Sequence, residues 1–224
     1  MATIKIFVRG KGKVLLSEEQ DYVADGGEGR IYAQGKIVYK IYLNRSQMIP
    51  EAKIAELAVL DRFNIIRPQD VILNEKNEVI GFTMARVDGT ELCRLFNTVF
   101  LQSNNITPEL LLKLVEQMQE TIQFIHAQGC LIVDGNEMNY LVDGGAYTTP
   151  FFIDVNSYQT PHFPATAITP IFSDPHAKVF SPLTDWFSFG IVACKLFVGI
   201  HPYKGTHPRY SKKDFLKRMQ DNVS

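Results

Sequence analysis

The sequence predicts an α+β protein in two parts, an antiparallel β-rich part with one helix over residues 1–87 and a mainly helical part over residues 88–224. Short β-branched and aromatic runs separated by Gly, Asn and Lys turns fill the first part. Apolar residues at helical spacing dominate the second part. A sheet followed by a helical half is typical of this class, and we expect a ligand cleft between the two halves.

The first part carries six clear strand signals and one helix signal. The strands are expected at residues 4–8, 13–16, 30–32, 36–42, 71–73 and 79–84. Residues 74–78 between the last two strands predict a hairpin loop. The helix is expected from about Pro50 to Phe63, with an apolar face formed by Ile54, Leu57, Ala58 and Leu60.

The second part predicts two long helices and a short one. Thr107 is a hydroxyl cap before Pro108 and Glu109, which is a good helix start, and Gly129 is a plausible terminator. The second helix is expected from about Asp185 to Val198, and a further short helix from 211 to 219. The chain ends soon afterwards, which indicates either a minimal second lobe or a piece of a longer protein.

Composition excludes several classes of protein. Of 224 residues, 46% are hydrophobic and 21% charged, which is typical of a folded globular chain. The 23 basic and 24 acidic residues give a net charge of −1, so neither nucleic acid nor a membrane surface is an expected partner. Three scattered cysteines and a first segment without signal-peptide features favour the cytoplasm. The apolar segment 186–200 is too short to span a bilayer and predicts a buried helix.

A glycine-rich turn lies between two strand signals and comprises Gly26, Gly27, Glu28 and Gly29. Glycines let a backbone turn tightly and bring its N–H groups close to phosphates. The third glycine of a G-x-G-x-x-G loop is absent, because Tyr32 stands there. An ordinary β-turn is therefore the competing interpretation.

Lys40 lies inside an apolar strand. A lysine on a half-buried strand needs an anion as partner, unless strand alternation turns it to solvent. Glu56 on the following helix is the expected partner and Glu51 the competing one. Both glutamates could equally be solvated helix residues.

Three further polar residues follow apolar runs in the second part. Asp134 and Asn139 are five apart on a predicted loop, and Asp154 ends an apolar strand. Magnesium prefers such oxygen ligands, and phosphoryl transfer needs a carboxylate to orient the attacking hydroxyl. The alternative for each is an Asx turn between short strands.

The order of these features resembles the protein kinase family, and the resemblance extends across most of the chain. The order is the glycine turn, the strand lysine, the helix glutamate, Asp-x-x-x-x-Asn and the strand aspartate. Residues 184–191 resemble the start of the central helix of its C-lobe, and residues 81–87 its hinge. The closest similarity is to a divergent bacterial group of serine/threonine kinase-like proteins. The resemblance implies a bilobal fold with an N-lobe over residues 1–87 and a truncated C-lobe over 88–224.

The resemblance also implies a role for each matching residue. Asp134 would orient or deprotonate the acceptor hydroxyl, and Asn139 and Asp154 would hold Mg²⁺ or Mn²⁺. Lys40, steadied by Glu56, would contact the ATP phosphates. Gly27, Glu28 and Gly29 would cover the phosphates. Met84 would be the gatekeeper, and the main chain of Ala85 and Val87 would face the adenine.

The chain departs from the family pattern at several positions. Ile132-Val133 replaces the usual His-Arg, and Asn136 replaces a lysine. Val155-Asn156 replaces Phe-Gly, and residues 173–176 lack the structural glutamate. We therefore expect activity that does not depend on a phosphorylated activation loop. The possible autophosphorylation sites are Thr160, Thr166, Thr169 and Ser173, and His126 is expected to pack or cap a helix.

Several functions stay open at this point. The first is an ATP-dependent kinase acting on Ser or Thr hydroxyls of its own chain or of an unidentified protein partner. The second is a pseudokinase, a nucleotide-binding regulatory module with little transfer, which the departures favour. The third is a small-molecule kinase of the aminoglycoside or choline type, against which the segment 184–191 argues. A non-catalytic domain would need five coincidences in order.

Overall fold

The computed structural model describes residues 3–211 and 213–224, so part of the predicted helix over 211–219 lies outside the described residues. The chain divides into two compact units, Met1–Val87 and Asp88–Ser224, and each unit is described by itself. The first is β-rich and the second mainly helical, which confirms the α+β class.

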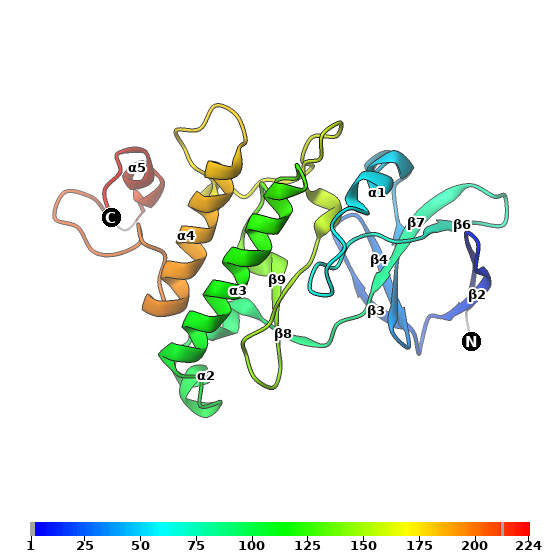
Figure 1. Cartoon of the computed structure of the whole chain (residues 1–224), viewed down its shortest axis with the longest axis horizontal. Helices are drawn as coiled ribbons and strands as arrows, with labels where there is room; N and C mark the ends of the chain where they lie inside the picture. The colour runs from blue at the N-terminus through cyan, green and yellow to red at the C-terminus, as the bar shows by residue number, and fades with distance from the viewer. Residues whose placement is uncertain (1–2, 212) are drawn as a thin grey trace. The chain divides into compact units, whose positions relative to one another are not determined.

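Unit 1 contains a single seven-stranded antiparallel sheet (Figure 1). Its strand order is β2-β1-β6-β7-β5-β4-β3. The strands are β1 (Thr3–Val8), β2 (Gly12–Ser17), β3 (Tyr22–Asp25), β4 (Gly29–Gln34), β5 (Ile37–Tyr42), β6 (Val71–Leu73) and β7 (Val79–Ala85). Strand β3 was not among the predicted strands, and all four of its residues are exposed.

The sheet of unit 1 buries apolar side chains in two clusters. One cluster joins the first hairpin to the middle of the sheet through Ile6, Leu16, Tyr32 and Ile72. The other surrounds Phe82, which is fully buried. Close approach of β5 and β7 is possible because β7 has Gly81, where an added Cβ would lie 1.9 Å from the carbonyl oxygen of Lys40.

The helix of unit 1 is shorter than the sequence predicted. Helix α1 spans Glu51–Leu57, whereas the prediction extended to Phe63. The main chain after Leu57 continues in i→i−3 hydrogen bonds, from Val59 to Glu56 and from Leu60 to Leu57. Such bonds tighten the end of a helix. The next buried apolar residue after Leu60 is Ile65, and five residues is not a spacing that keeps two side chains on one face of a helix.

Unit 2 is built on two long helices, α3 (Pro108–Ala127) and α4 (Pro182–Val198), which pack against each other (Figure 1). A small antiparallel sheet of order β10-β9-β8 accompanies them. Its strands are β8 (Gly89–Glu91), β9 (Tyr140–Asp143) and β10 (Pro150–Phe152). Short helices α2 (Thr98–Ser103) and α5 (Phe215–Gln220) complete the unit, with 3₁₀ turns that include η3 (Glu137–Asn139) and η4 (Val155–Ser157).

The ends of the long helices follow local signals in the sequence. Thr107 Oγ1 accepts the N–H of Leu110 and Gly129 has φ +74°, which confirms the predicted start and stop of α3. Helix α4 starts three residues before the predicted Asp185, because Pro182 is at its first turn and Thr184 Oγ1 accepts the N–H of Ser181. Its last residues lead to Gly199 at φ +79°.

Candidate active site

The buried carboxylate of Asp185 on α4 organises the segment that follows α3. Its Oδ1 accepts the main-chain N–H of Val133 at 2.8 Å, and its Oδ2 accepts that of Ile132 at 2.8 Å. The ring nitrogen Nε2 of His126 on α3 lies 2.9 Å from the same Oδ2. Three donors compensate for removing this charge from water. His126 thus links α3 to the start of α4 and also contacts the Trp186 ring, which is the packing role among the two expected for it.

Val133 adopts a conformation that β-branched residues avoid. Its φ is +64°, and it is the central residue of a three-residue turn in which the N–H of Asp134 donates to the carbonyl of Ile132 at 2.8 Å. A non-glycine residue in this region costs about 1–3 kcal/mol and persists only where surrounding contacts impose it. The two hydrogen bonds to Asp185 supply those contacts. The strain is therefore stored in the residue directly before Asp134.

The carboxylate of Asp134 is buried and only half satisfied. Its Oδ2 accepts a hydrogen bond from Asn136 Nδ2 at 3.0 Å. Its Oδ1 is buried and has no hydrogen-bond partner among the residues that the structure describes. Buried polar atoms are almost always paired, so an unpaired one needs an explanation, and a catalytic role is one of the explanations that apply to a carboxylate.

Asn136 connects Asp134 to a distant segment. Its Nδ2 also lies 3.3 Å from Thr169 Oγ1, and its Oδ1 accepts the N–H of Met138 at 2.8 Å. The side chain is 8% exposed and is held at both ends. The residue that the sequence indicated only as a loss from the family pattern thus fixes the orientation of the Asp134 carboxylate.

Asn139 and Asp154 lie close together because β9 and β10 pair. Tyr140 of β9 stands opposite Phe152 of β10, and the next N–H, of Ile153, donates to the carbonyl of Asn139 at 3.0 Å. Asn139 Nδ2 donates to the carbonyl of Asp134 at 2.8 Å, which leaves its amide oxygen directed elsewhere. Asp154 follows in the left-handed region at φ +56°.

Asn139 and Asp154 fit a magnesium site that is completed by phosphate and water better than a metal site formed by protein ligands alone. No group of three or more His, Cys, Asp or Glu side chains that could hold a metal ion occurs within residues 3–211 and 213–224. One amide oxygen and one carboxylate are nevertheless the donor set of Mg²⁺ sites that are completed by phosphates and water. Asn139 and Asp154 are therefore suited to a metal that arrives with a phosphate ligand.

In unit 1, Lys40 is paired with a residue that the sequence did not suggest. Its Nζ lies 2.7 Å from Glu28 Oε2 in the glycine-rich turn. The competing candidate Glu51 is paired with Arg9, so that alternative was wrong. Glu56 lies on α1 with its side chain partly buried, and its pairing with Lys40 stays a prediction.

The glycine-rich turn joins β3 to β4. A Cβ added to Gly27 would meet no heavy atom within 4 Å, whereas one added to Gly29 would lie 2.4 Å from the carbonyl oxygen of Ile41. The turn is thus open at Gly27 and tightly packed at Gly29. Glycine is required at Gly29 for close approach of the two strands, as in a loop that brings main chain near a ligand.

The predicted adenine-facing residues lie at the end of β7. Met84 stands opposite Val38, and Ala85 opposite Ile37. Both side chains are partly buried, and so is that of Val87, which follows the strand. Among the described residues, Val87 takes no part in the main-chain hydrogen bonds of the turns and loops.

A pocket of about 470 Å³ lies beside the Asp134 loop within unit 2. Its lining combines apolar and polar side chains from the loop, from the segment before α4 and from α4 itself, including Val133, Ile168, Phe180, Thr184 and Ser188. Among the proposed autophosphorylation sites, Thr160 is 4% exposed and is therefore the least accessible, whereas Thr166 is exposed.

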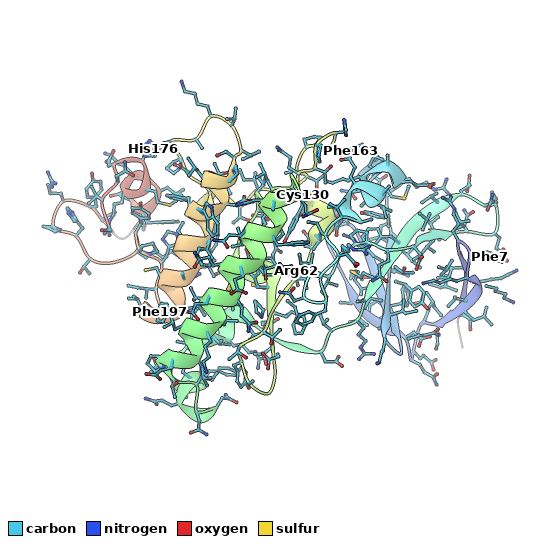
Figure 2. All side chains as sticks on the ribbon, in the orientation of Figure 1. Phe7, Arg62, Cys130, Phe163, His176 and Phe197 are labelled. Carbon is cyan, nitrogen blue, oxygen red and sulfur yellow. The ribbon has the colours of Figure 1, made fainter. Side chains whose placement is uncertain are left out.

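Sequence reasoning missed the groups that hold the loop. Asp185 was noted only as part of a helix start, and the contacts of Asp185 with Ile132 and Val133 span more than fifty residues of chain. Figure 2 shows Cys130 just beyond the end of α3, from which the chain runs directly into this loop. The signal available in the sequence is an Asp at the start of a predicted apolar helix, where a carboxylate needs hydrogen-bond donors if it is buried.

The comparisons with known proteins give no family assignment. No protein-family model matches the chain, and no curated protein matches it. Within the described residues, no helix has both the length and the apolar character that crossing a membrane requires.

Proposed function

We propose that the chain is an ATP- and Mg²⁺-dependent protein kinase that transfers the γ-phosphate to Ser or Thr hydroxyls, its own or those of a protein partner. The observation that carries this proposal is the buried Asp134 carboxylate, which has one oxygen held by Asn136 and the other without a partner in the described residues. A carboxylate on a strained, tightly supported turn is typical of a pre-organised catalytic group.

The order of elements around the glycine turn supports the proposal. Counted from β3, which precedes the turn, β5 is the third strand, and it carries Lys40. A glycine-rich loop followed by a lysine on the third strand is the arrangement by which protein kinases hold ATP phosphates. Met84, Ala85 and Val87 are assigned to the adenine, and Gly27, Glu28 and Gly29 to the cover of the phosphates.

Asn139 and Asp154 are assigned to magnesium. The ion, when bound with the nucleotide, would neutralise charge on the phosphate oxygens. The amide nitrogen of Asn139 is held by its donation to the Asp134 carbonyl, so the amide oxygen is the atom left to serve as a ligand. Asp154 adds the single negative charge of this pair.

Asp134 is assigned to the acceptor hydroxyl. The hydroxyl donates to Oδ1, which orients its oxygen towards the γ-phosphorus. A bond forms between that oxygen and the γ-phosphorus while the bond to the β–γ bridging oxygen breaks. The hydroxyl proton passes to Asp134, and ADP leaves. Asn136 keeps the other carboxylate oxygen fixed throughout.

A pseudokinase is the second candidate, and one observation favours it. Lys40 is already paired with Glu28 at 2.7 Å, so the cation assigned to the phosphates has a partner within the chain. A module in which this pair persists would bind nucleotide weakly and transfer little. It would share the fold and the site with the first candidate, and only activity separates the two.

The test follows label from γ-labelled ATP into protein in the presence of Mg²⁺ or Mn²⁺. Wild type is compared with Asp134→Ala and with Asp61→Asn, which alters a carboxylate that is 87% exposed. The proposal predicts label in wild type and Asp61→Asn but not in Asp134→Ala. Equal label in all three would rule out the role of Asp134, and ATP binding without label would favour the pseudokinase.

A further inference from the structure

The ion pair between Glu28 and Lys40 joins two residues that the proposed function assigns to the same nucleotide. Glu28 lies in the glycine-rich turn, and its Oε2 is 2.7 Å from Lys40 Nζ on β5. The lysine side chain is 9% exposed and the glutamate 35%. The cation is thus largely removed from water, while its carboxylate partner is reached from the open side of the turn.

Two aromatic rings also lie near the ammonium group. Lys40 Nζ lies 5.2 Å from the ring centroid of Tyr42 and 5.8 Å from that of Phe82. Ring faces attract a cation but do not neutralise it. A buried ammonium therefore requires an anion, and Glu28 supplies that anion here.

The Glu28 side chain can leave Lys40 without unpairing the sheet. The carbonyl of Glu28 accepts the N–H of Leu43 at 3.1 Å, and the next residue, Gly29, is packed against β5. The preceding Gly27 has open space on the side where a Cβ would stand. The main chain of Glu28 is anchored while its carboxylate reaches Lys40 through rotatable bonds, so displacement costs the ion pair and little else.

We propose that Glu28 is an internal competitor for Lys40, whose carboxylate must be displaced before nucleotide phosphates can reach the ammonium. This inference rests on the proposed function. Every ligand that brings phosphate to Lys40 must replace an anion already held there within the chain, so its affinity is lowered. A ligand without phosphate leaves the pair intact and is not affected.

The test measures calorimetric dissociation constants for Mg²⁺·ATP, Mg²⁺·ADP and adenosine. Wild type is compared with Glu28→Gln and with Glu19→Gln, which removes one exposed negative charge of unit 1 that forms no ion pair among the described residues. Glu28→Gln should bind ATP and ADP about fivefold more tightly, the factor that loss of a partly exposed ion pair gives. Adenosine binding should be unchanged, and Glu19→Gln should match wild type for all three.

Two outcomes separate this inference from the function on which it rests. ATP binding that Glu28→Gln leaves unchanged or weakens would overturn the competition while the proposed function stands. If neither wild type nor either variant binds ATP, the proposed function is contradicted and the inference with it. If Glu28→Gln does not fold, Glu28→Asp keeps the charge but shortens its reach, and the same tighter binding of ATP and ADP is expected.

Discussion

Asp185 Oδ1 accepts the N–H of Val133 at 2.8 Å, and Val133 holds a left-handed conformation at φ +64°. The two observations explain each other, because a β-branched residue stays in that region only when other contacts impose it. The strain and its support lie directly before Asp134, whose carboxylate is the centre of the proposed site. This relationship leads to the first prediction.

Asp185→Asn should strongly destabilise unit 2. The amide presents an N–H where the carboxylate now accepts hydrogen bonds from Ile132, Val133 and His126, so at least one buried donor loses its partner. We expect a loss of about 3 kcal/mol in the free energy of unfolding. Urea unfolding measures it, with the exposed Asp61→Asn as control. A loss below 0.5 kcal/mol, about the scatter of surface substitutions, would show that Asp185 does not hold the loop.

Gly81→Ala should destabilise unit 1, because the new Cβ would lie 1.9 Å from the Lys40 carbonyl oxygen and would force β5 and β7 apart. We expect a loss of about 2–3 kcal/mol in the free energy of unfolding. The matched control is Gly27→Ala, where no atom lies within 4 Å of the added methyl group. Urea unfolding of both variants tests this. Equal stability of the two would mean that the strands are not in such close contact.

Asn136→Asp should shift the pH dependence of phosphoryl transfer. It replaces the amide that donates to Asp134 Oδ2 at 3.0 Å with a second carboxylate. Two carboxylates at this separation disfavour each other's ionisation, so a higher pH is needed to ionise both members of the pair. The acidic limb of the rate profile should therefore move to higher pH. Initial rates from pH 5 to 9 measure this, and an unmoved limb would exclude contact between the two side chains during catalysis.

Protonation of His201 should destabilise unit 2 as pH falls. Burial lowers the pKa of this ring, although donation to the Ile171 carbonyl at 2.8 Å acts in the opposite direction. The unfolded chain therefore binds a proton near pH 6.5 while the folded chain does not. The contribution of the neutral His201 ring to the free energy of unfolding is fully present above that pH. It is lost as pH falls below it, by at most about 1.4 kcal/mol per pH unit.

Unfolding between pH 7.5 and 5 measures the effect of His201. His201→Asn should flatten the dependence, whereas substitution of the exposed His176 to Asn should not. An unchanged slope in His201→Asn would show that another group carries the proton.

Sequence reasoning succeeded where the signals are local. The start of α3 follows from the Thr107 cap and its end from Gly129. The predicted hairpin after β6 is present, and Asn74 Oδ1 accepts the N–H groups of Lys76 and Glu78 within it. Each of these features depends on residues a few positions apart, so composition and spacing are enough to predict them.

Features that depend on distant residues could not be predicted in this way. The ion pair between Lys40 and Glu28 was not predicted, because the choice among several carboxylates depends on how the turn folds over β5. The positive φ of Val133 depends on Asp185, which is 52 residues away. Helix α1 ends early although Leu60 is buried at the predicted helical spacing, because the main chain after Leu57 changes to i→i−3 hydrogen bonds that spacing alone does not predict.

The most direct measurement of the central claim is the initial rate of γ-phosphate transfer from Mg²⁺·ATP by wild type and Asp134→Asn, with ATP affinity determined for both. The account predicts that both proteins bind ATP equally well and that the rate falls by about 100-fold or more in the variant. Transfer at the wild-type rate by Asp134→Asn would contradict the account, because the carboxylate at the centre of the site would then have no catalytic role.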